Sequence, residues 1–156
     1  MRPSRDEVFK EMTEALAQRS VCLRKKVAAM IVKDGRPISV GYNGPPSGFP
    51  HCTKDTCKGK DCDISIHAEM NAIAFAAKSG VSIKGSTMYC TMSPCINCAK
   101  VILNSGIVRV VYFEEYRLRE GIELLERGGV EVGLLEVNLE RREKIEKLYR
   151  EYFSKD

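Results

Sequence analysis

Four residues in the middle of the chain have the types and the spacing of a metal-dependent active site. One residue separates His67 from Glu69, and two separate Cys95 from Cys98. Imidazole nitrogen and thiolate sulfur are ligands that zinc prefers in proteins. A carboxylate that is not itself a ligand can carry protons beside such a metal. These residues therefore indicate metal-assisted hydrolysis.

The two thiols are expected at the start of a helix that follows a strand. Cys95 and Cys98 come directly after Pro94. In a first helical turn, the helix dipole and the free backbone N–H groups favour the thiolate form, which binds zinc. One imidazole and two thiolates leave the fourth tetrahedral position for water, which is the arrangement of a catalytic zinc site.

Glu69 fits this interpretation only if it reaches the same cavity as His67. Residues i and i+2 point to different faces of a regular helix. We therefore expect His67 at the very start of its helix, where the backbone lets both side chains converge. A carboxylate placed there can take a proton from water and return it to a substrate nitrogen.

Each half of this pattern also has an ordinary structural interpretation. A single histidine is usually a hydrogen-bonded core residue, and a single Cys-x-x-Cys pair can be structural or redox-active. Both halves occur here, each at the predicted start of a helix. The combination favours zinc.

Four further cysteines are predicted to bind a second zinc ion: Cys22, Cys52, Cys57 and Cys62. Three of them lie in residues 43–66, which have no hydrophobic period, and a loop of this length needs something to pin it. Four thiolates would form a closed, structural site. Free thiols, a disulfide pair, and replacement of one ligand by His51 are the alternatives.

Apolar periodicity and turn residues predict the elements around these residues. A capping box, Ser4 to Glu7, begins the first helix, and Asp34-Gly35 is a hairpin turn. Helices are expected at 4–18, 67–79, 95–105, 118–127 and 139–153, and strands at 27–32, 38–42, 87–92, 108–113 and 130–137. Cys90 falls on a strand expected to be buried, where a thiol would be inert.

Strands and helices alternate after the hairpin, which indicates a sheet with at least one parallel pair and helices on its faces. We predict one α/β domain spanning residues 1–156, a three-layer α/β/α sandwich with a cysteine-rich insert at about 43–66.

Composition excludes several classes of function. The chain has 156 residues, 44% of them hydrophobic, and a net charge of +4. That charge is spread out, which argues against nucleic-acid or membrane binding, and no apolar run is long enough to span a bilayer. Seven cysteines without an export signal argue against a disulfide framework. A cytoplasmic protein is expected.

Three longer blocks carry a family resemblance. They are GYNGPPSG (41–48), HAEMNAI (67–73) and TMSPCINCAKVILNSGI (91–107). H-x-E followed by P-C-x-x-C is the signature of zinc-dependent deaminases. Over roughly residues 4–135 the chain resembles the deoxycytidylate (dCMP) deaminases of the cytidine deaminase superfamily. The resemblance implies a mixed five-stranded sheet.

The resemblance also implies roles for individual residues. His67, Cys95 and Cys98 would hold the catalytic zinc, and Glu69 would shuttle protons. Asn43 would contact the sugar, and Tyr116 resembles a family aromatic near the substrate. Hydroxide would attack C4 of cytosine, Glu69 would protonate N3 and the leaving ammonia, and dUMP would result, for use in thymidylate synthesis. Lys78 is a weak candidate for a phosphate ligand.

The same resemblance suggests assembly and regulation. A homo-oligomer, specifically a hexamer, activated by dCTP and inhibited by dTTP, is the expectation. Phage members of the family carry an extra zinc, and Cys22 and Cys52 resemble two of its ligands.

Two other kinds of function compete with this one. A zinc-stabilised binding module would close every metal site with protein ligands and give Glu69 no role. A sister deaminase would act on cytidine, cytosine or a tRNA adenosine. The tRNA enzyme would need a stronger basic face, and it is not expected to carry the GYNG block and the cysteine-rich insert.

Overall fold

A mixed five-stranded sheet forms the centre of the fold, with the strand order β2-β1-β3-β4-β5. We describe a computed structural model, which covers residues 2–59, 62–136, 140, 143, 144, 147, 150 and 151. Its elements are α1 (Arg5–Ala17), β1 (Ala28–Lys33), β2 (Arg36–Tyr42), α2 (Ala68–Lys78), β3 (Thr87–Cys90), α3 (Ile96–Ser105), β4 (Arg109–Tyr112), α4 (Glu120–Arg127) and β5 (Glu131–Leu134).

The N-terminal helix and the hairpin form as their sequences predict. Ser4 Oγ accepts a hydrogen bond from the Glu7 backbone N–H at 3.2 Å, and the Glu7 carboxylate accepts one from the Ser4 N–H at 2.7 Å. This is the expected capping box. At the tip of the hairpin, Asp34 and Gly35 have φ values of 50° and 71°, the left-handed conformation that a two-residue turn between twisted strands requires.

The strands pair in two different ways. β1 is antiparallel to both β2 and β3, whereas β3, β4 and β5 are parallel. Parallel neighbours need crossover connections, and α3 and α4 provide them. The predicted strands at 87–92 and 130–137 are too long, because pairing ends at Cys90 and Leu134. Residues 91–94 leave the sheet and lead to Cys95.

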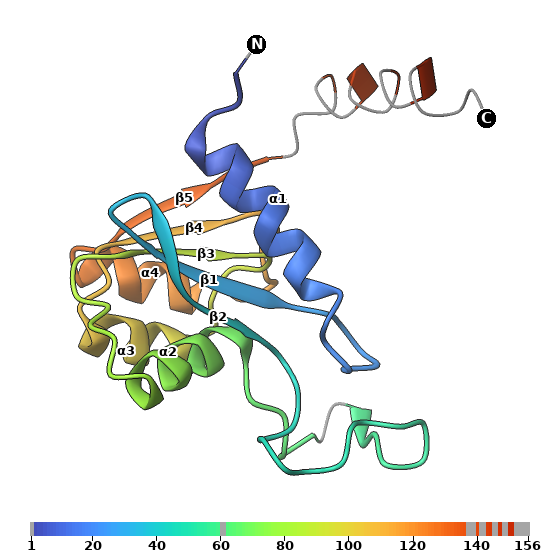
Figure 1. Ribbon diagram of the computed structural model, residues 1–156. Coiled ribbons are helices and arrows are strands. Elements are labelled where there is room, and N and C mark those ends of the chain that lie inside the picture. The colour runs from blue at the N-terminus through green and yellow to red at the C-terminus, as the bar shows by residue number, and fades with distance from the viewer. Residues whose placement is uncertain are drawn as a thin grey trace.

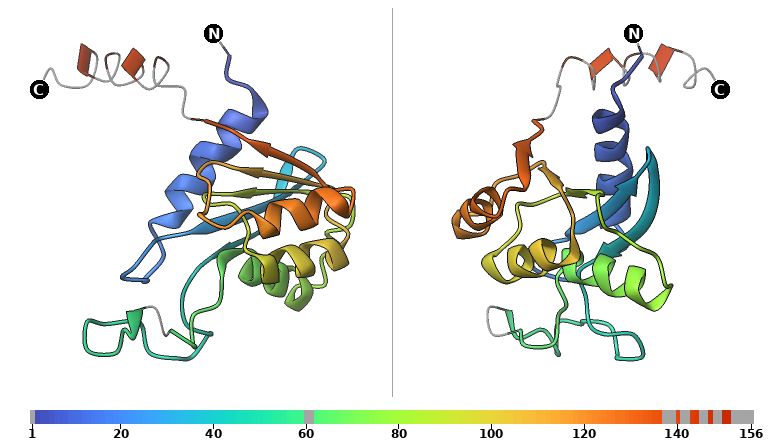
Figure 2. Two further views of the ribbon diagram at one scale, coloured as in Figure 1. Left: turned by 180° about the vertical axis from the view of Figure 1, so that it is seen from behind. Right: turned by 90° about the vertical axis from the view of Figure 1, so that its left-hand side faces the viewer.

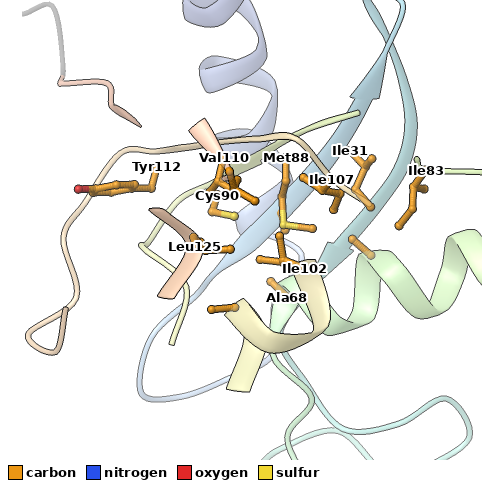
Figure 3. Close-up of a cluster of buried hydrophobic side chains, with 14 of the residues drawn as sticks. Ile31, Ala68, Ile83, Met88, Cys90, Ile102, Ile107, Val110, Tyr112 and Leu125 are labelled. Atoms are coloured by element: carbon orange, nitrogen blue, oxygen red, sulfur yellow. The ribbon is translucent and has the colours of Figure 1, made fainter. Parts of the chain in front are cut away.

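Helices cover both faces of the sheet, which confirms the three-layer α/β/α prediction (Figure 1, Figure 2). α1 lies on one face, and α2, α3 and α4 lie on the other. The larger core fills the second interface, where Ile31, Met88 and Val110 of the sheet face Ile102 and Leu125 of the helices (Figure 3). All five side chains are fully buried, and so is the predicted inert thiol of Cys90.

The segment between β2 and α2 contains no α-helix or strand in its described part, residues 43–59 and 62–66. An isolated bridge between Gly44 and Ile66 closes its base. The Arg24 guanidinium donates to the Gly59 carbonyl at 3.1 Å and so ties the segment to the α1–β1 connection. Most of the helix predicted at 139–153 lies outside the described residues. None of the described helices is both long and apolar enough to cross a membrane.

Candidate active site

A cavity of about 420 Å³ lies where the carboxyl ends of β3 and β4 meet the start of α2, a size typical of small-molecule sites. Met92, Ser93 and Cys95 enter it from the segment after β3, and Tyr116 enters from the segment after β4. His67 and Glu69 enter from the start of α2. Ligand sites in α/β proteins are common at this edge of a sheet.

His67, Cys95 and Cys98 form a compact group of potential metal ligands. The Nδ1 atom of His67 lies 3.5 Å from the sulfur of Cys95 and 3.5 Å from that of Cys98. Zinc bonds of about 2.0–2.1 Å to nitrogen and 2.3 Å to sulfur, at a tetrahedral angle, place the two ligand atoms about 3.5 Å apart. In the described part of the chain this is the one group of three such ligand atoms within 4.8 Å of one another. The residues therefore fit a zinc ion.

The helix starts explain how these side chains converge. His67 is the N-cap of α2, with the extended backbone angles φ −68° and ψ 150°, and Cys95 is the N-cap of α3, with φ −72° and ψ 169°. Neither side chain caps its own helix by a hydrogen bond. Because His67 precedes the helical turn that carries Glu69, both side chains reach one cavity, as the i and i+2 spacing required.

Two glycines allow the close packing that holds these helix starts. A Cβ atom on Gly41 of β2 would lie 2.4 Å from the Ala68 carbonyl oxygen in the first turn of α2. A Cβ atom on Gly121 of α4 would lie 2.1 Å from the carbonyl oxygen of Pro94. Both distances are far below van der Waals contact, so only glycine fits without displacing the backbone next to a ligand residue.

Burial raises the pKa of the Glu69 carboxyl group toward neutrality. Glu69 is 4% exposed, and this burial raises its pKa from the ordinary value of 4.5 to about 7. The charge of His67 and a hydrogen bond from the Cys98 thiol act in the opposite direction but are weaker. A carboxyl group with a pKa near neutrality can both accept and release a proton at physiological pH.

The two thiols share one negative charge. A hydrogen bond from Cys98 lowers the pKa of the Cys95 thiol to about 3, and His67 lowers it further. The same hydrogen bond, together with burial, raises the pKa of Cys98. The hydrogen bond with Cys95 also raises the pKa of His67. Zinc binding would displace the remaining proton, because the metal binds the thiolate form.

The four remaining candidate zinc ligands lie around the same cavity. Its lining includes Cys22, Cys52, Cys57 and Cys62. Burial, followed by the nearby sulfurs of Cys62, Cys22 and Cys57, raises the pKa of the Cys52 thiol, so the four groups are electrostatic neighbours. Among the described residues, no three of these four sulfurs lie within 4.8 Å of one another. His51 is exposed and is not part of the lining.

The substrate contacts suggested by the resemblance fall in different places. Asn43 and Tyr116 line the cavity, and the Tyr116 backbone N–H is held by Ser93 Oγ at 2.7 Å. Lys78 lies in the last turn of α2, at the opposite end of the helix from His67, with its ammonium 6.0 Å from the Phe75 ring centre. Lys78 is therefore wrongly placed for a phosphate ligand in this cavity, because it is the last of the eleven residues of α2, whose first turn lies at the site.

Two other positively charged residues line the cavity, whereas Lys78 does not. Arg24 and Lys25 are exposed and line the cavity, and the Lys25 ammonium lies 2.5 Å from the Glu114 carboxylate. The sequence analysis did not assign them to the site. Their position close to Cys22, a predicted ligand of the second zinc ion, was the signal that could have identified them.

Comparison with known proteins agrees with this geometry. Residues 3–114 match the family described as "Cytidine and deoxycytidylate deaminase zinc-binding region". "ComE operon protein 2" of Bacillus subtilis (strain 168) is 42% identical over 152 residues, covering 92% of this chain and 80% of that protein. "Deoxycytidylate deaminase" of Enterobacteria phage T4 is 37% identical over 159 residues, covering 75% of this chain and 82% of that protein.

A solved structure extends the similarity to three dimensions. The dCMP deaminase from the cyanophage S-TIM5, in complex with dCMP and dUMP, is 40% identical with a TM-score of 0.77. The match covers 88% of this chain and 99% of that chain. The metal-ligand geometry, the matched zinc-binding region and these relatives together lead to one assignment: the chain belongs to the cytidine and deoxycytidylate deaminase family.

Proposed function

We propose that this protein catalyses the hydrolytic deamination of dCMP to dUMP and ammonia, and that it supplies dUMP for thymidylate synthesis. The observation that carries the proposal is the buried Glu69 carboxyl group beside three ligand atoms at the spacing of a tetrahedral zinc site. The relatives named deoxycytidylate deaminase, and the similar structure with dCMP and dUMP, support the choice of substrate.

In the proposed reaction, three residues would bind the metal and Glu69 transfers the protons. His67, Cys95 and Cys98 would hold a zinc ion, which supplies a nucleophilic water near neutral pH when bound. Glu69 accepts a proton from the attacking water and delivers it to N3 of the pyrimidine. It then takes the remaining proton from the hydroxyl group newly attached to C4 and passes it to the C4 amino group, so that the C4–N bond breaks and ammonia leaves. The oxygen of water becomes O4 of dUMP, and Glu69 returns to its starting state.

Arg24 and Lys25 give the cavity a preference for an anionic substrate. Both side chains are exposed at its wall, where they can reach the 5′-phosphate of a nucleotide. A guanidinium and an ammonium are the usual partners of phosphate in proteins. A free base or a nucleoside offers these two residues no phosphate to bind.

Turnover of a substrate series tests the proposal. Zinc-loaded protein should deaminate dCMP with a higher kcat/KM than deoxycytidine, cytidine, cytosine or a tRNA anticodon loop. Deoxycytidine is the matched control, because it lacks only the phosphate. Ammonia release from a nucleoside or a base, but not from dCMP at the same concentration, would exclude the nucleotide assignment. No turnover of any of them would favour the binding module.

We also propose a second, structural zinc ion bound by Cys22, Cys52, Cys57 and Cys62. These four thiols are neighbours around one cavity, although they belong to two segments separated by thirty residues of sequence or more. Four thiolates form a closed site, so this ion would contribute to folding rather than catalysis. It would fix the insert against the α1–β1 connection, as the hydrogen bond from Arg24 to Gly59 already does.

Metal analysis tests the second ion. Two zinc ions per chain are expected in the metal-replete protein. Cys57→Ala should reduce the zinc content toward one ion and lower the melting temperature, whereas Lys58→Ala, a change at an exposed neighbour, should do neither. One zinc ion per chain in fully active, metal-replete protein excludes the second site.

Assembly and regulation complete the proposal. We propose a homo-oligomer, specifically a hexamer, that dCTP activates and dTTP inhibits, and a cytoplasmic location. Exposed apolar side chains on α2 and α3, namely Phe75, Ile96 and Val101, offer surface for subunit contacts. Saturation curves for dCMP should become more hyperbolic with dCTP and shift to higher concentration with dTTP. Hyperbolic kinetics that neither triphosphate changes would exclude this regulation.

A further inference from the structure

Hydrogen bonds within the protein use most of the donors and acceptors of the Asn43 side-chain amide. Its Oδ1 accepts hydrogen bonds from Ser20 Oγ at 2.6 Å and from the Val27 N–H at 2.9 Å. Its Nδ2 donates to the Lys25 carbonyl at 2.8 Å. The backbone of Asn43 contacts the same segment, because its N–H donates a hydrogen bond to the Val27 carbonyl at 3.0 Å. Asn43 therefore holds the chain segment that precedes β1.

Counting donors and acceptors shows what the amide can still offer to a ligand. An amide has two acceptor sites on oxygen and two N–H donors. The contacts with Ser20, Val27 and Lys25 use both acceptor sites and one donor. The Val27 N–H also fixes the orientation, since a flipped amide would place N–H against N–H. One Nδ2–H is left, in a residue that lines the cavity.

Ser20 is the second donor to the amide oxygen of Asn43. It is 3% exposed, and its hydroxyl lies between Asn43 Oδ1 at 2.6 Å, the Asn43 carbonyl oxygen at 2.9 Å and the Cys22 N–H at 3.2 Å. The hydroxyl thus donates toward Asn43 and accepts from the segment that carries Arg24 and Lys25. Ser20 is not part of the cavity lining.

We propose that Ser20 is a positioning residue for substrate binding. Its hydroxyl holds the Asn43 amide so that one N–H is presented to an acceptor on the substrate sugar, the 3′-oxygen of a deoxynucleotide. The inference rests on the proposed deamination of dCMP and adds to it a donor-only role for Asn43 and a determinant of KM outside the cavity.

The test compares Ser20→Ala and Ser20→Thr with the parent enzyme on two substrates, dCMP and its 3′-deoxy analogue, 2′,3′-dideoxycytidine monophosphate. Loss of the hydroxyl should raise KM for dCMP roughly tenfold, the upper range for one hydrogen bond, with kcat nearly unchanged because binding is lost equally in the ground and transition states. Ser20→Thr, which keeps the hydroxyl, should restore the parental KM. On the analogue, Ser20→Ala and parent should differ by no more than about twofold, because the acceptor is missing.

Ser86→Ala is the matched control. Ser86 is 1% exposed and donates a 2.6 Å hydrogen bond to the Ile83 carbonyl, remote from the cavity lining. It should lower the melting temperature and leave KM unchanged. Kinetics are measured at a temperature at which every variant is folded. An unchanged KM for dCMP in Ser20→Ala, or an equal rise for dCMP and the analogue, overturns the proposal. Failure of the parent to deaminate dCMP would instead refute the proposed function.

Discussion

The carboxyl group of Glu69 shows most directly how a single residue reports function. It is buried beside two thiols and an imidazole, and burial disfavours its charged form. A protein gains no stability from an acid in such a place. The pKa of about 7 is instead the value that a group must have to take and return a proton near neutral pH.

At the same scale, the charged residues of the cavity wall predict how substrate is recognised. Replacing Arg24 by Gln and Lys25 by Met together should raise KM for dCMP by about tenfold to a hundredfold, since hydrogen bonds to charged groups contribute about 1.5–3 kcal/mol. KM for deoxycytidine should hardly change, because it has no phosphate.

Lys78→Met is the control for that experiment, because it removes an ammonium from the far end of α2. It should leave KM for both substrates at the parental value. A larger effect from Lys78→Met than from the double replacement would show that phosphate binds elsewhere.

At the scale of elements, the site depends on where α2 and α3 begin. Gly121→Ala would force a Cβ atom of α4 into the Pro94 carbonyl. It should reduce the free energy of unfolding by about 1–3 kcal/mol, the range for overpacking, and weaken zinc retention by displacing Cys95. Melting temperature and metal content measure both effects.

Gly133→Ala is the control within the same half of the molecule. Nothing lies within 4 Å of a Cβ atom at Gly133, so this variant should keep its zinc and its stability. If Gly121→Ala and Gly133→Ala behaved alike, close packing of α4 on residues 94–95 would not be what holds the ligand in place.

The attachment of α1 to the sheet makes a prediction about pH. Asp6 accepts hydrogen bonds from both terminal nitrogens of Arg109, at 3.1 and 2.7 Å, and one from the Tyr89 hydroxyl at 2.5 Å. The contact with Arg109 is the main cause that lowers the pKa of Asp6 below 3.8. A carboxyl group whose folded pKa is lowered stabilises the protein above its unfolded pKa, and this contribution is lost as the pH falls through the folded value.

Asp6→Asn should therefore lower the melting temperature at pH 7, and the difference from the parent should shrink at an acid pH low enough to protonate Asp6. Glu131→Gln removes the more exposed partner of Arg109 and should have little effect at either pH. A difference for Asp6→Asn that is the same at both pH values would mean that its charge is irrelevant.

At the scale of the whole molecule, the sequence predicts the layers of the fold better than the ends of the strands. Period and caps identify the helices up to residue 127, the hairpin and the alternation that requires parallel strands, and each of these is confirmed. Strand ends were missed by two or three residues, because pairing partners rather than local propensity decide where a strand stops.

The same division holds within the site. His67, Cys95 and Cys98 could be predicted because ligand chemistry restricts the residue types and their spacing. Asn43 could be assigned to the site, but its hydrogen bonds to Ser20, Val27 and Lys25 depend on a connection that sequence spacing does not reveal. Lys78 was misplaced because a residue that follows the site in sequence need not face it in the fold.

The exposed apolar side chains of α2 and α3 lead us to predict that the chains form a homo-oligomer. Light scattering should give a mass of several chains, and Phe75→Lys, which places a charge on the exposed apolar surface of α2, should reduce that mass. Val108→Lys, a change at an exposed residue just before β4, is the control and should leave the mass unchanged. A monomeric parent would contradict the predicted oligomer.

One variant tests the central claim most directly, namely that Glu69 moves the protons of a zinc-dependent dCMP deamination. Glu69→Gln keeps the size of the side chain and all three metal ligands, so its zinc content should equal that of the parent, whereas Cys98→Ala should lose both metal and activity. The rate of dUMP formation by zinc-loaded Glu69→Gln should fall by about a factor of 10²–10⁴ or more, the contribution of general acid–base catalysis. A zinc-loaded Glu69→Gln protein that converts dCMP within about tenfold of the parental rate would contradict the account, because this is less than general acid–base catalysis contributes.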